Sequence, residues 1–359
     1  MLRNRSVLCA CPKSATDKKT EDMILPTTYG AALLLTIVSM ICWGSWANTF
    51  KLTKKWRFEL FYFDYAFGVL LLAVIAAFTF GSMGDELSFM DNLSIAGKKQ
   101  MAWALGAGIV FNLANMLLVA AISIAGLAVA FPIGIGLALV IGVIWNFILN
   151  PQGNPLLLFS GAALVVIAII VDALAYRTHD LSLKKAPGKT GASIKGIIIS
   201  LVSGVLMGSF YPLVEMSKAG EIGLGPYSVA VFFGIGVFCS TFVFNFYFMN
   251  LPVEGDPVSI SRYFRGTGKF HLLGILGGVI WCAGAITNFV ASSAPVKVGP
   301  AVSYAMGQGA TMVSVLWGLL VWHEFRGANS RVKLLLTVMM ILFVSGLALV
   351  SIAPLYATR

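Results

Sequence analysis

The stretch VSMICWGSWANTFK, residues 38–51, ends the first long apolar run of the chain and combines tryptophan, small residues and an amide. A helix that only holds a chain in a bilayer has no use for this mixture. VSGVLMGSFYPLVE, residues 202–215, aligns with it, and Val-Ser, Gly-Ser and a following aromatic residue coincide. A segment that recurs in the second half of a chain predicts an internally repeated fold.

The composition places both segments in a membrane. Hydrophobic residues make up 58% of the 359 residues and charged residues only 11%, whereas a soluble domain carries about 25% charged residues. Uninterrupted runs of roughly 20 apolar residues favour membrane-crossing helices over the short alternating strands of a barrel. The sequence therefore predicts an all-α polytopic membrane protein with ten transmembrane helices, at 28–48, 60–81, 101–122, 127–149, 155–176, 194–215, 226–249, 271–293, 299–322 and 333–354.

Two further pairs of spans extend the repeat. FPIGIGLALV (131–140) matches YAMGQGATMV (304–313), and GAGIVFNLAN (106–115) corresponds to LGGVIWCAGA (276–285). Because five spans per half is an odd number, the second half enters the membrane from the opposite side, which gives a 5+5 inverted repeat. The predicted units are an N-terminal tail (1–27), a first five-helix repeat (28–176), a central cytoplasmic linker (177–193), a second five-helix repeat (194–354) and a C-terminal tail (355–359).

Basic residues between the spans indicate the orientation. Lys and Arg are more numerous in the loops after spans 1, 5, 7 and 9 than on the other side, and basic loops stay on the cytoplasmic side. The sequence thus predicts a multi-pass protein of the cell inner (plasma) membrane with both termini outside. The tail 1–22 holds five basic residues on the outer side, and we interpret Met23 as the start of translation, which removes them.

Polar and aromatic side chains within the spans predict a solute path between the two halves. Such groups are costly against lipid and tolerated beside a wet cavity, and aromatic faces with a few amides suit a flat neutral solute. Three alternatives stay open: Trp46 in an interfacial aromatic belt, Asn112 and Asn115 as links between helices, and Tyr304 with Gln308 in helix packing. The candidate substrate-binding residues are Trp43, Trp46, Asn48, Asn112, Asn115, Tyr211, Tyr304 and Gln308.

Glycines within the same spans predict close helix packing. They follow no strand and lie inside apolar runs, so they do not form a phosphate-binding loop. We expect the glycines of the first and sixth spans to let these two related helices approach, or to leave room for a solute. The candidate packing glycines are Gly44, Gly208, Gly134, Gly136, Gly307 and Gly309.

Carboxylates in the spans are candidates for proton coupling. A carboxyl group in a low-dielectric site binds a proton more readily than it does in water, and can carry that proton with the solute. Asp64, in FELFYFDY (58–65), is the first candidate, ahead of Glu215 and Asp172. Asp64 and Asp172 can instead pair with a loop lysine or arginine at the interface.

Several chemistries find no support in the residues. The five cysteines have neither metal-binding spacing nor a disulfide framework, and VWHEF (321–325) lacks the second histidine of a zinc helix. APGKTGAS (186–193) lacks the first glycine of a nucleotide-binding loop, and we interpret it as linker. We therefore expect no enzyme, metal, cofactor or nucleic-acid partner. The expected partners are a small-molecule solute, protons and the lipid bilayer; whether the chain is a monomer or a homodimer stays open.

The spans resemble the drug/metabolite transporter superfamily, in the branch with ureide permeases, glucose/ribose-type uptake proteins and rhamnose–proton symporters. FDYAFGVLLLAVIAAFTFG (63–81) is similar to the second span of ureide permeases, and ICWGS (41–45) and VWHEF resemble motifs of bacterial glucose uptake proteins. KKWRFE (54–59) and GIGLALVIG (134–142) resemble the rhamnose symporter.

This resemblance implies a ten-helix inverted-repeat fold and proton-coupled uptake of a small polar solute such as allantoin, uracil or a hexose. It marks Trp43, Gly44, Asp64 and Tyr65 as family-pattern positions. The chain departs from plant ureide permeases in its first span, where they have Gly-Thr-Trp-Pro, and in its short central loop. We therefore predict uptake of a ureide or nucleobase, with sugar uptake and efflux of a metabolite or drug as the alternatives.

Overall fold

The computed structural model describes residues 24–53, 56–83, 87–182, 194–252, 256–295 and 298–356. The proposed start at Met23 and the linker motif 186–193 lie outside the described residues. Within these ranges every regular element is helical, and nine helices are long and apolar enough to cross a membrane. Large apolar side chains such as Leu34, Ile75 and Ile148 are exposed on the outer faces of the bundle, as a surface in contact with lipid requires. The chain is therefore a polytopic α-helical membrane protein.

The helices of the first half are α1 (Tyr29–Ser45), α2 (Ala47–Leu52), α3 (Phe58–Phe78), α4 (Phe89–Ile95), α5 (Lys98–Ala125), α6 (Leu127–Phe131), α7 (Leu137–Leu149) and α8 (Pro155–Ser182). Those of the second half are α9 (Ile194–Lys218), α10 (Pro226–Asn250), α11 (Ser261–Phe264), α12 (Gly268–Ser293), α13 (Pro300–Gly307), α14 (Ala310–Leu320) and α15 (Ser330–Ile352). Short turns of other helix types lie at Phe80–Ser82, Pro132–Gly136 and Ala353–Tyr356.

The run at 299–322 differs from the expected single span. It forms α13 and α14, which are separated at Gln308 and Gly309 and are each too short to be counted with the nine long helices. A Cβ atom at Gly309 would overlap Met40 of α1 and Leu347 of α15, so the break lies where three elements meet closely. The run at 127–149 is also interrupted, by a π-helical turn that begins at Pro132, because proline has no amide hydrogen for the preceding turn.

Close backbone contacts at glycine hold the long helices together. Gly108 of α5 and Gly236 of α10 each lie against the backbone of the other helix, and Gly68 of α3 and Gly278 of α12 do the same. Small residues allow such approach in a bilayer, where apolar side chains gain little by leaving lipid. The closely packed pairs are α5 with α9, α8 with α15, α3 with α12, α3 with α10, α5 with α10, α1 with α12, α7 with α9, α1 with α14, and α7 with α13.

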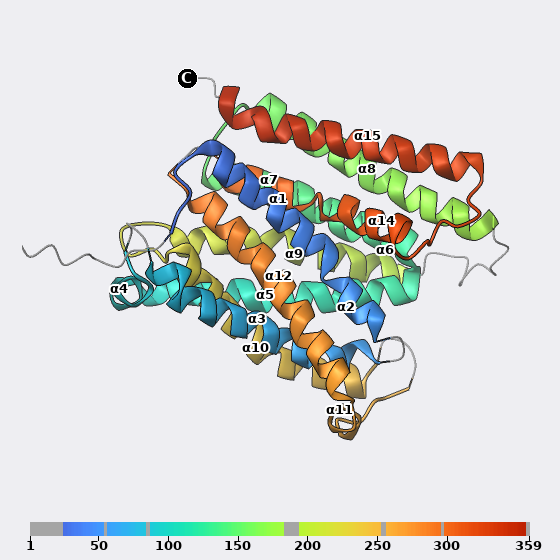
Figure 1. The fold of residues 1–359 in the computed structure, drawn as a ribbon, viewed down its shortest axis with the longest axis horizontal. Coiled ribbons are helices and arrows are strands. Elements are labelled where there is room, and N and C mark those ends of the chain that lie inside the picture. The colour runs from blue at the N-terminus through green and yellow to red at the C-terminus, as the bar shows by residue number, and fades with distance from the viewer. Residues whose placement is uncertain are drawn as a thin grey trace, which may run out of the picture.

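The bundle has two ends, which Figure 1 shows around α4 and around α11. At the α4 end the chain turns between α3 and α5, α7 and α8, α9 and α10, and α12 and α13. At the α11 end it turns between α2 and α3, α10 and α12, and α14 and α15. Helices α8 and α15 lie side by side along one edge of the bundle (Figure 1).

Candidate functional site

A cavity opens at the α4 end of the bundle. Its volume is about 580 Å³, and the last turns of α9 and α12 form part of its wall. Glu215 and Lys218 of α9 and Ser292 and Ser293 of α12 line this part. The exposed Glu221 borders the cavity as well. A solute can therefore reach these four side chains from the α4 end.

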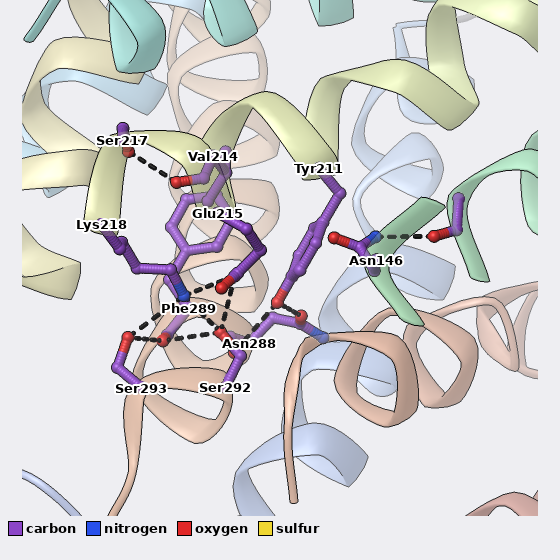
Figure 2. A network of polar contacts seen from close by, with 11 residues as sticks. Asn146, Tyr211, Val214, Glu215, Ser217, Lys218, Asn288, Phe289, Ser292 and Ser293 are labelled. Carbon is purple, nitrogen blue, oxygen red and sulfur yellow. Dashed lines mark hydrogen bonds and ion pairs between the residues drawn. The ribbon is translucent and has the colours of Figure 1, made fainter. Parts of the chain in front are cut away.

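An ion pair dominates the polar wall of the cavity, as Figure 2 shows. Lys218 Nζ lies 2.5 Å from Glu215 Oε1 and donates to Ser292 Oγ at 2.7 Å and Ser293 Oγ at 3.2 Å. The two charged side chains are only 10% and 11% exposed. Charges this buried need partners, because either one left alone would be strongly destabilising. The Glu215–Lys218 pair therefore adds no net charge to the cavity wall.

A second polar group continues from the ion pair into the bundle. The hydroxyl of Tyr211, one turn before Glu215, donates to Asn288 Oδ1 at 2.6 Å (Figure 2). Asn288 Nδ2 in turn donates to Ser39 Oγ at 3.1 Å and to the carbonyl of Ser303 at 2.9 Å. All four residues are buried. This group joins α9, α12, α1 and α13 at one point behind the cavity.

Aromatic rings surround that point. Trp43 stacks on Trp281 with ring centroids 5.9 Å apart and donates Nε1 to the Trp281 carbonyl at 3.2 Å. Phe111 lies against Trp281 at 4.3 Å, and Tyr304 lies against Tyr211 at 5.2 Å. The layer combines flat apolar faces with the amide and hydroxyl groups of the neighbouring polar group, which is the chemistry that binds flat polar solutes.

Both tryptophans of the opening stretch face the inside of the bundle. A Cβ atom at Gly307 or Gly284 would overlap the ring of Trp43, which therefore lies between α12 and α13. The ring of Trp46 lies against Tyr65 of α3, with centroids 4.8 Å apart. Trp46 is thus half-buried and in contact with another helix.

Polar contacts join α1 and α2 to α14 and the segment after it at the α11 end. Trp322 Nε1 donates to Asn48 Oδ1 at 2.5 Å, and Trp317 Nε1 donates to Ser45 Oγ at 2.8 Å. Lys51 forms an ion pair with Glu324. We call these contacts the α11-end closure. Asn48 thus lies in the closure, away from the cavity and the aromatic layer.

Asp64 also lies toward the α11 end, held by two side chains from later in the chain. Tyr263 of α11 donates its hydroxyl to Asp64 Oδ1 at 2.6 Å, and His271 Nδ1 of α12 lies 2.8 Å from Oδ2. Burial and the neighbouring Asp64 carboxylate raise the pKa of Tyr263, so this hydroxyl stays protonated and donates. The expected alternative partner was a loop Lys or Arg; the partners found are Tyr and His.

The two asparagine candidates of α5 form hydrogen bonds to other helices. Asn112 Nδ2 donates to Ser240 Oγ at 2.7 Å on α10. Asn115 Nδ2 donates to Tyr62 OH at 3.0 Å on α3. Both therefore link helices.

Tyr304 and Gln308 lie on the interrupted ninth run. Tyr304 is fully buried and its hydroxyl donates to the carbonyls of Ala138 and Met207 at 3.3 Å each. Gln308 lies at the break between α13 and α14. Asp172 of α8 is buried, and its Oδ1 has no partner among the described residues.

We expected Gly44 of the first span and Gly208 of the sixth span to let these two helices approach each other. Each glycine instead lies against another helix. A Cβ atom at Gly44 would overlap the Ala310 carbonyl of α14, and one at Gly208 would approach the Ala138 carbonyl of α7. Each glycine therefore lies against a different helix, not against the other glycine. Gly307 lies under Trp43, Gly134 lies near Leu118, and a Cβ atom at Gly136 would meet nothing within 4 Å.

Sequence reasoning missed several residues of these groups, namely Lys218, Ser292, Tyr263, His271 and Trp281. Two of them could have been noticed in the sequence: His271 lies in the first turn of an apolar run, and Lys218 lies one turn after Glu215. The partner of His271 could not be predicted, because Asp64 lies on a different helix. The contacts of Lys218 with Ser292 and Ser293 of α12 could not be predicted for the same reason. Within the described ranges no group of three His, Cys, Asp or Glu residues is placed to hold a metal ion.

The comparisons with known proteins agree with this architecture. The family model of ureide permeases matches residues 61–190 and 179–353. Ureide permease 2 of Arabidopsis thaliana is 24% identical over 396 aligned positions, which cover 91% of this chain and 98% of that protein. Glucose uptake protein GlcU of Bacillus subtilis (strain 168) is 23% identical, and the match covers 66% of this chain and 74% of that protein.

A solved crystal structure shares the fold, with a TM-score of 0.59, 17% sequence identity, and coverage of 90% of this chain and 96% of the other. The relatives are permeases and uptake proteins, which agrees with the expectation that the chain is not an enzyme. The resemblance inferred from the spans is confirmed, and the chain belongs to the ureide permease family.

Proposed function

We propose that the chain is a secondary active transporter that takes up a small neutral ureide or nucleobase, such as allantoin or uracil, by alternating access. The observation that carries the proposal is the difference between the two ends of the bundle. A cavity of about 580 Å³ opens at the α4 end, while α1, α2 and the segment around α14 are joined by polar contacts at the α11 end. A solute path that is open at one end and closed at the other is what alternating access requires.

The pattern of helix contacts supports a 5+5 inverted repeat. Exchange of each helix with the one five spans later pairs α1 with α9, α3 with α10, α5 with α12, α7 with α13 and α14, and α8 with α15. This exchange converts the α1–α12 contact into α9–α5, the α3–α12 contact into α10–α5, and the α7–α9 contact into α14–α1, all of which occur. We therefore propose that residues 28–176 and 194–354 form related halves that rock against each other.

The centre of the bundle suits a solute rich in amide groups. Tyr65 OH, Ser303 Oγ and Asn146 Oδ1 are buried without a partner among the described residues. Buried polar atoms are normally hydrogen-bonded, so a solute that enters between the halves has groups to satisfy. Trp43, Tyr211 and Tyr304 add aromatic faces beside them, and stacking on such faces favours a flat ring.

Proton coupling is proposed for Asp64. Its carboxylate is buried and lies between an OH donor and the imidazole of His271, so a proton bound there changes the contacts between α3, α11 and α12. Histidine and carboxylate side chains form the proton relays of many transporters. Glu215, which is already paired with Lys218, and Asp172 are the lesser candidates.

Sugar uptake is the second candidate function, because the match to the glucose uptake protein covers 66% of the chain. Uptake of labelled allantoin, uracil, rhamnose and glucose into proteoliposomes, with and without an inward proton gradient, separates the two. We expect allantoin or uracil to accumulate only with the gradient. Accumulation of the sugars alone would replace the first function with the second, and transport of none of the four would favour efflux.

A further inference from the structure

The short helix α11 is fixed to the end of the bundle on one side (Figure 1). Tyr263 donates its hydroxyl to Asp64 Oδ1 at 2.6 Å. Val258, three residues before α11, is buried. A Cβ atom at Gly266, just after α11, would overlap the ring of Trp56, so the backbone lies directly against that ring. The segment around α11 therefore has a defined position on the bundle.

The other side chains of this segment are exposed and basic. Arg262 and Arg265 are three positions apart, a spacing that puts them on one side of a helical turn, and both are exposed. Lys269, in the first turn of α12, is exposed as well. None of the three forms an ion pair with another described residue. The described segment 256–272 holds these three basic residues and one acid, Asp256, so it is positively charged.

An apolar ring lies next to these charges in the chain. Phe264 is 77% exposed, and it belongs to a helix of four residues that does not cross the membrane. A large ring gains free energy by leaving water. The combination matches a phospholipid: guanidinium groups bind a phosphate through paired N–H donors, and an aromatic ring packs at the boundary between headgroups and acyl chains. We call Arg262, Phe264, Arg265 and Lys269 the α11 patch.

We propose that the α11 patch binds the headgroup of an anionic phospholipid of the surrounding bilayer. The orientation predicted from the loop charges puts α11 on the cytoplasmic side, where anionic lipids attract basic segments next to a membrane helix. A zwitterionic phospholipid offers the same phosphate without net negative charge, so it gains less from the three basic side chains. Each basic residue near an anionic surface contributes about fivefold to binding. This binding does not depend on which solute the chain transports.

The test measures lipid binding to the purified full chain in a neutral detergent by native mass spectrometry. The probes are phosphatidylglycerol and phosphatidylcholine with identical acyl chains, and water-soluble glycerol phosphate, which has an anionic phosphate and no acyl chain. We expect phosphatidylglycerol to bind at least about tenfold more tightly than phosphatidylcholine. Glycerol phosphate should not compete with it; competition at equal concentration would reveal a site for soluble anions and overturn the assignment to lipid.

Two variants of the α11 patch separate charge from apolar contact. The combination of Arg262→Gln, Arg265→Gln and Lys269→Gln should abolish most of the preference for phosphatidylglycerol, because it removes the three charges from exposed positions. Phe264→Ala should weaken the binding of both phospholipids at least about threefold and keep the preference, since the ring contacts acyl chains that the two lipids share. Unchanged binding of both lipids by the Phe264→Ala protein would remove the ring from the site.

The combination of Arg326→Gln, Arg331→Gln and Lys333→Gln is the matched control. It removes the same residue types from exposed positions near the turn between α14 and α15, at the same end of the bundle, and should keep the native preference. Equal binding of the two phospholipids by the native protein, a preference retained without the charges of the α11 patch, or an equal loss in the control would overturn the inference. A photoreactive phosphatidylglycerol tests the native chain directly: crosslinks should fall within residues 256–272, and crosslinks confined to other segments would also overturn it.

Discussion

Asp64 offers a way to separate proton coupling from solute passage. Its carboxylate accepts from Tyr263 OH at 2.6 Å and lies 2.8 Å from His271 Nδ1. Asparagine has nearly the same shape as aspartate and can still accept a hydrogen bond from Tyr263 and donate one to a neutral His271. Its side-chain amide, however, does not bind a proton near neutral pH. We expect Asp64→Asn to lose accumulation of solute against a gradient and to retain exchange of solute across the membrane.

The size of both effects can be worked out. A pH difference of one unit corresponds to about 1.4 kcal/mol per proton, so one proton per solute sustains about a tenfold accumulation. In the variant this ratio should fall to about one. Two hydrogen bonds to a charged group become hydrogen bonds between neutral groups, which costs roughly 2 kcal/mol of folding stability. Since domains are stable by about 5–15 kcal/mol, the variant should stay folded.

The assay compares two measurements on the same proteoliposomes: accumulation of labelled allantoin under an imposed pH gradient, and counterflow exchange without one. Asp180→Asn is the matched control, because Asp180 is exposed near the same end of the bundle, and it should behave as the native protein. An Asp64→Asn protein that still accumulates solute tenfold would refute the reasoning and direct attention to Glu215 and Asp172.

Three other predictions concern packing, the buried polar group and orientation. Gly44→Val should lower the free energy of unfolding by about 1–3 kcal/mol, because the new side chain overlaps α14, whereas Gly136→Ala should have little effect; equal unfolding temperatures for both variants would contradict this. Tyr211→Phe removes the donor to Asn288 and should cost about 1–3 kcal/mol in thermal unfolding; a cost near zero would show that the hydrogen bond contributes nothing. A single cysteine in place of the exposed Ser94 should react with an impermeant thiol reagent on intact cells, and one in place of Ser261 only after permeabilisation; the reverse result would invert the proposed orientation.

The apolar runs predicted the long helices because hydrophobicity over about 20 residues is a local property of the sequence. The break at Gln308 and Gly309 was not predictable in this way. Both halves of that run are apolar, and the interruption lies where Met40 and Leu347 approach Gly309. The break therefore lies at contacts with helices that are distant in the sequence, and a hydropathy profile does not record such contacts.

The candidate site was predictable only in part. Asp64 and Glu215 stood out as rare acids near or within apolar runs, but their pairing with His271 and Lys218 did not, since His271 is on another helix and Lys218 lies beyond the predicted span 194–215. Asn112 and Asn115 illustrate the opposite difficulty. The two residues are three positions apart, a spacing that puts them on one face of a helix, yet Asn112 contacts α10 and Asn115 contacts α3. A shared face therefore did not imply a shared partner.

The crossing of α8 and α15 has a consequence for how the molecule can move. A Cβ atom at Gly161 would overlap the carbonyl of Gly346, and one at Gly346 would overlap the carbonyl of Gly161, so the two backbones touch. Helices in such contact resist sliding along their axes, because peptide groups would collide before side chains could yield. Under the proposed alternating access, we therefore expect α8 and α15 to keep their mutual position, and the displacement to be taken up by the helices beside them.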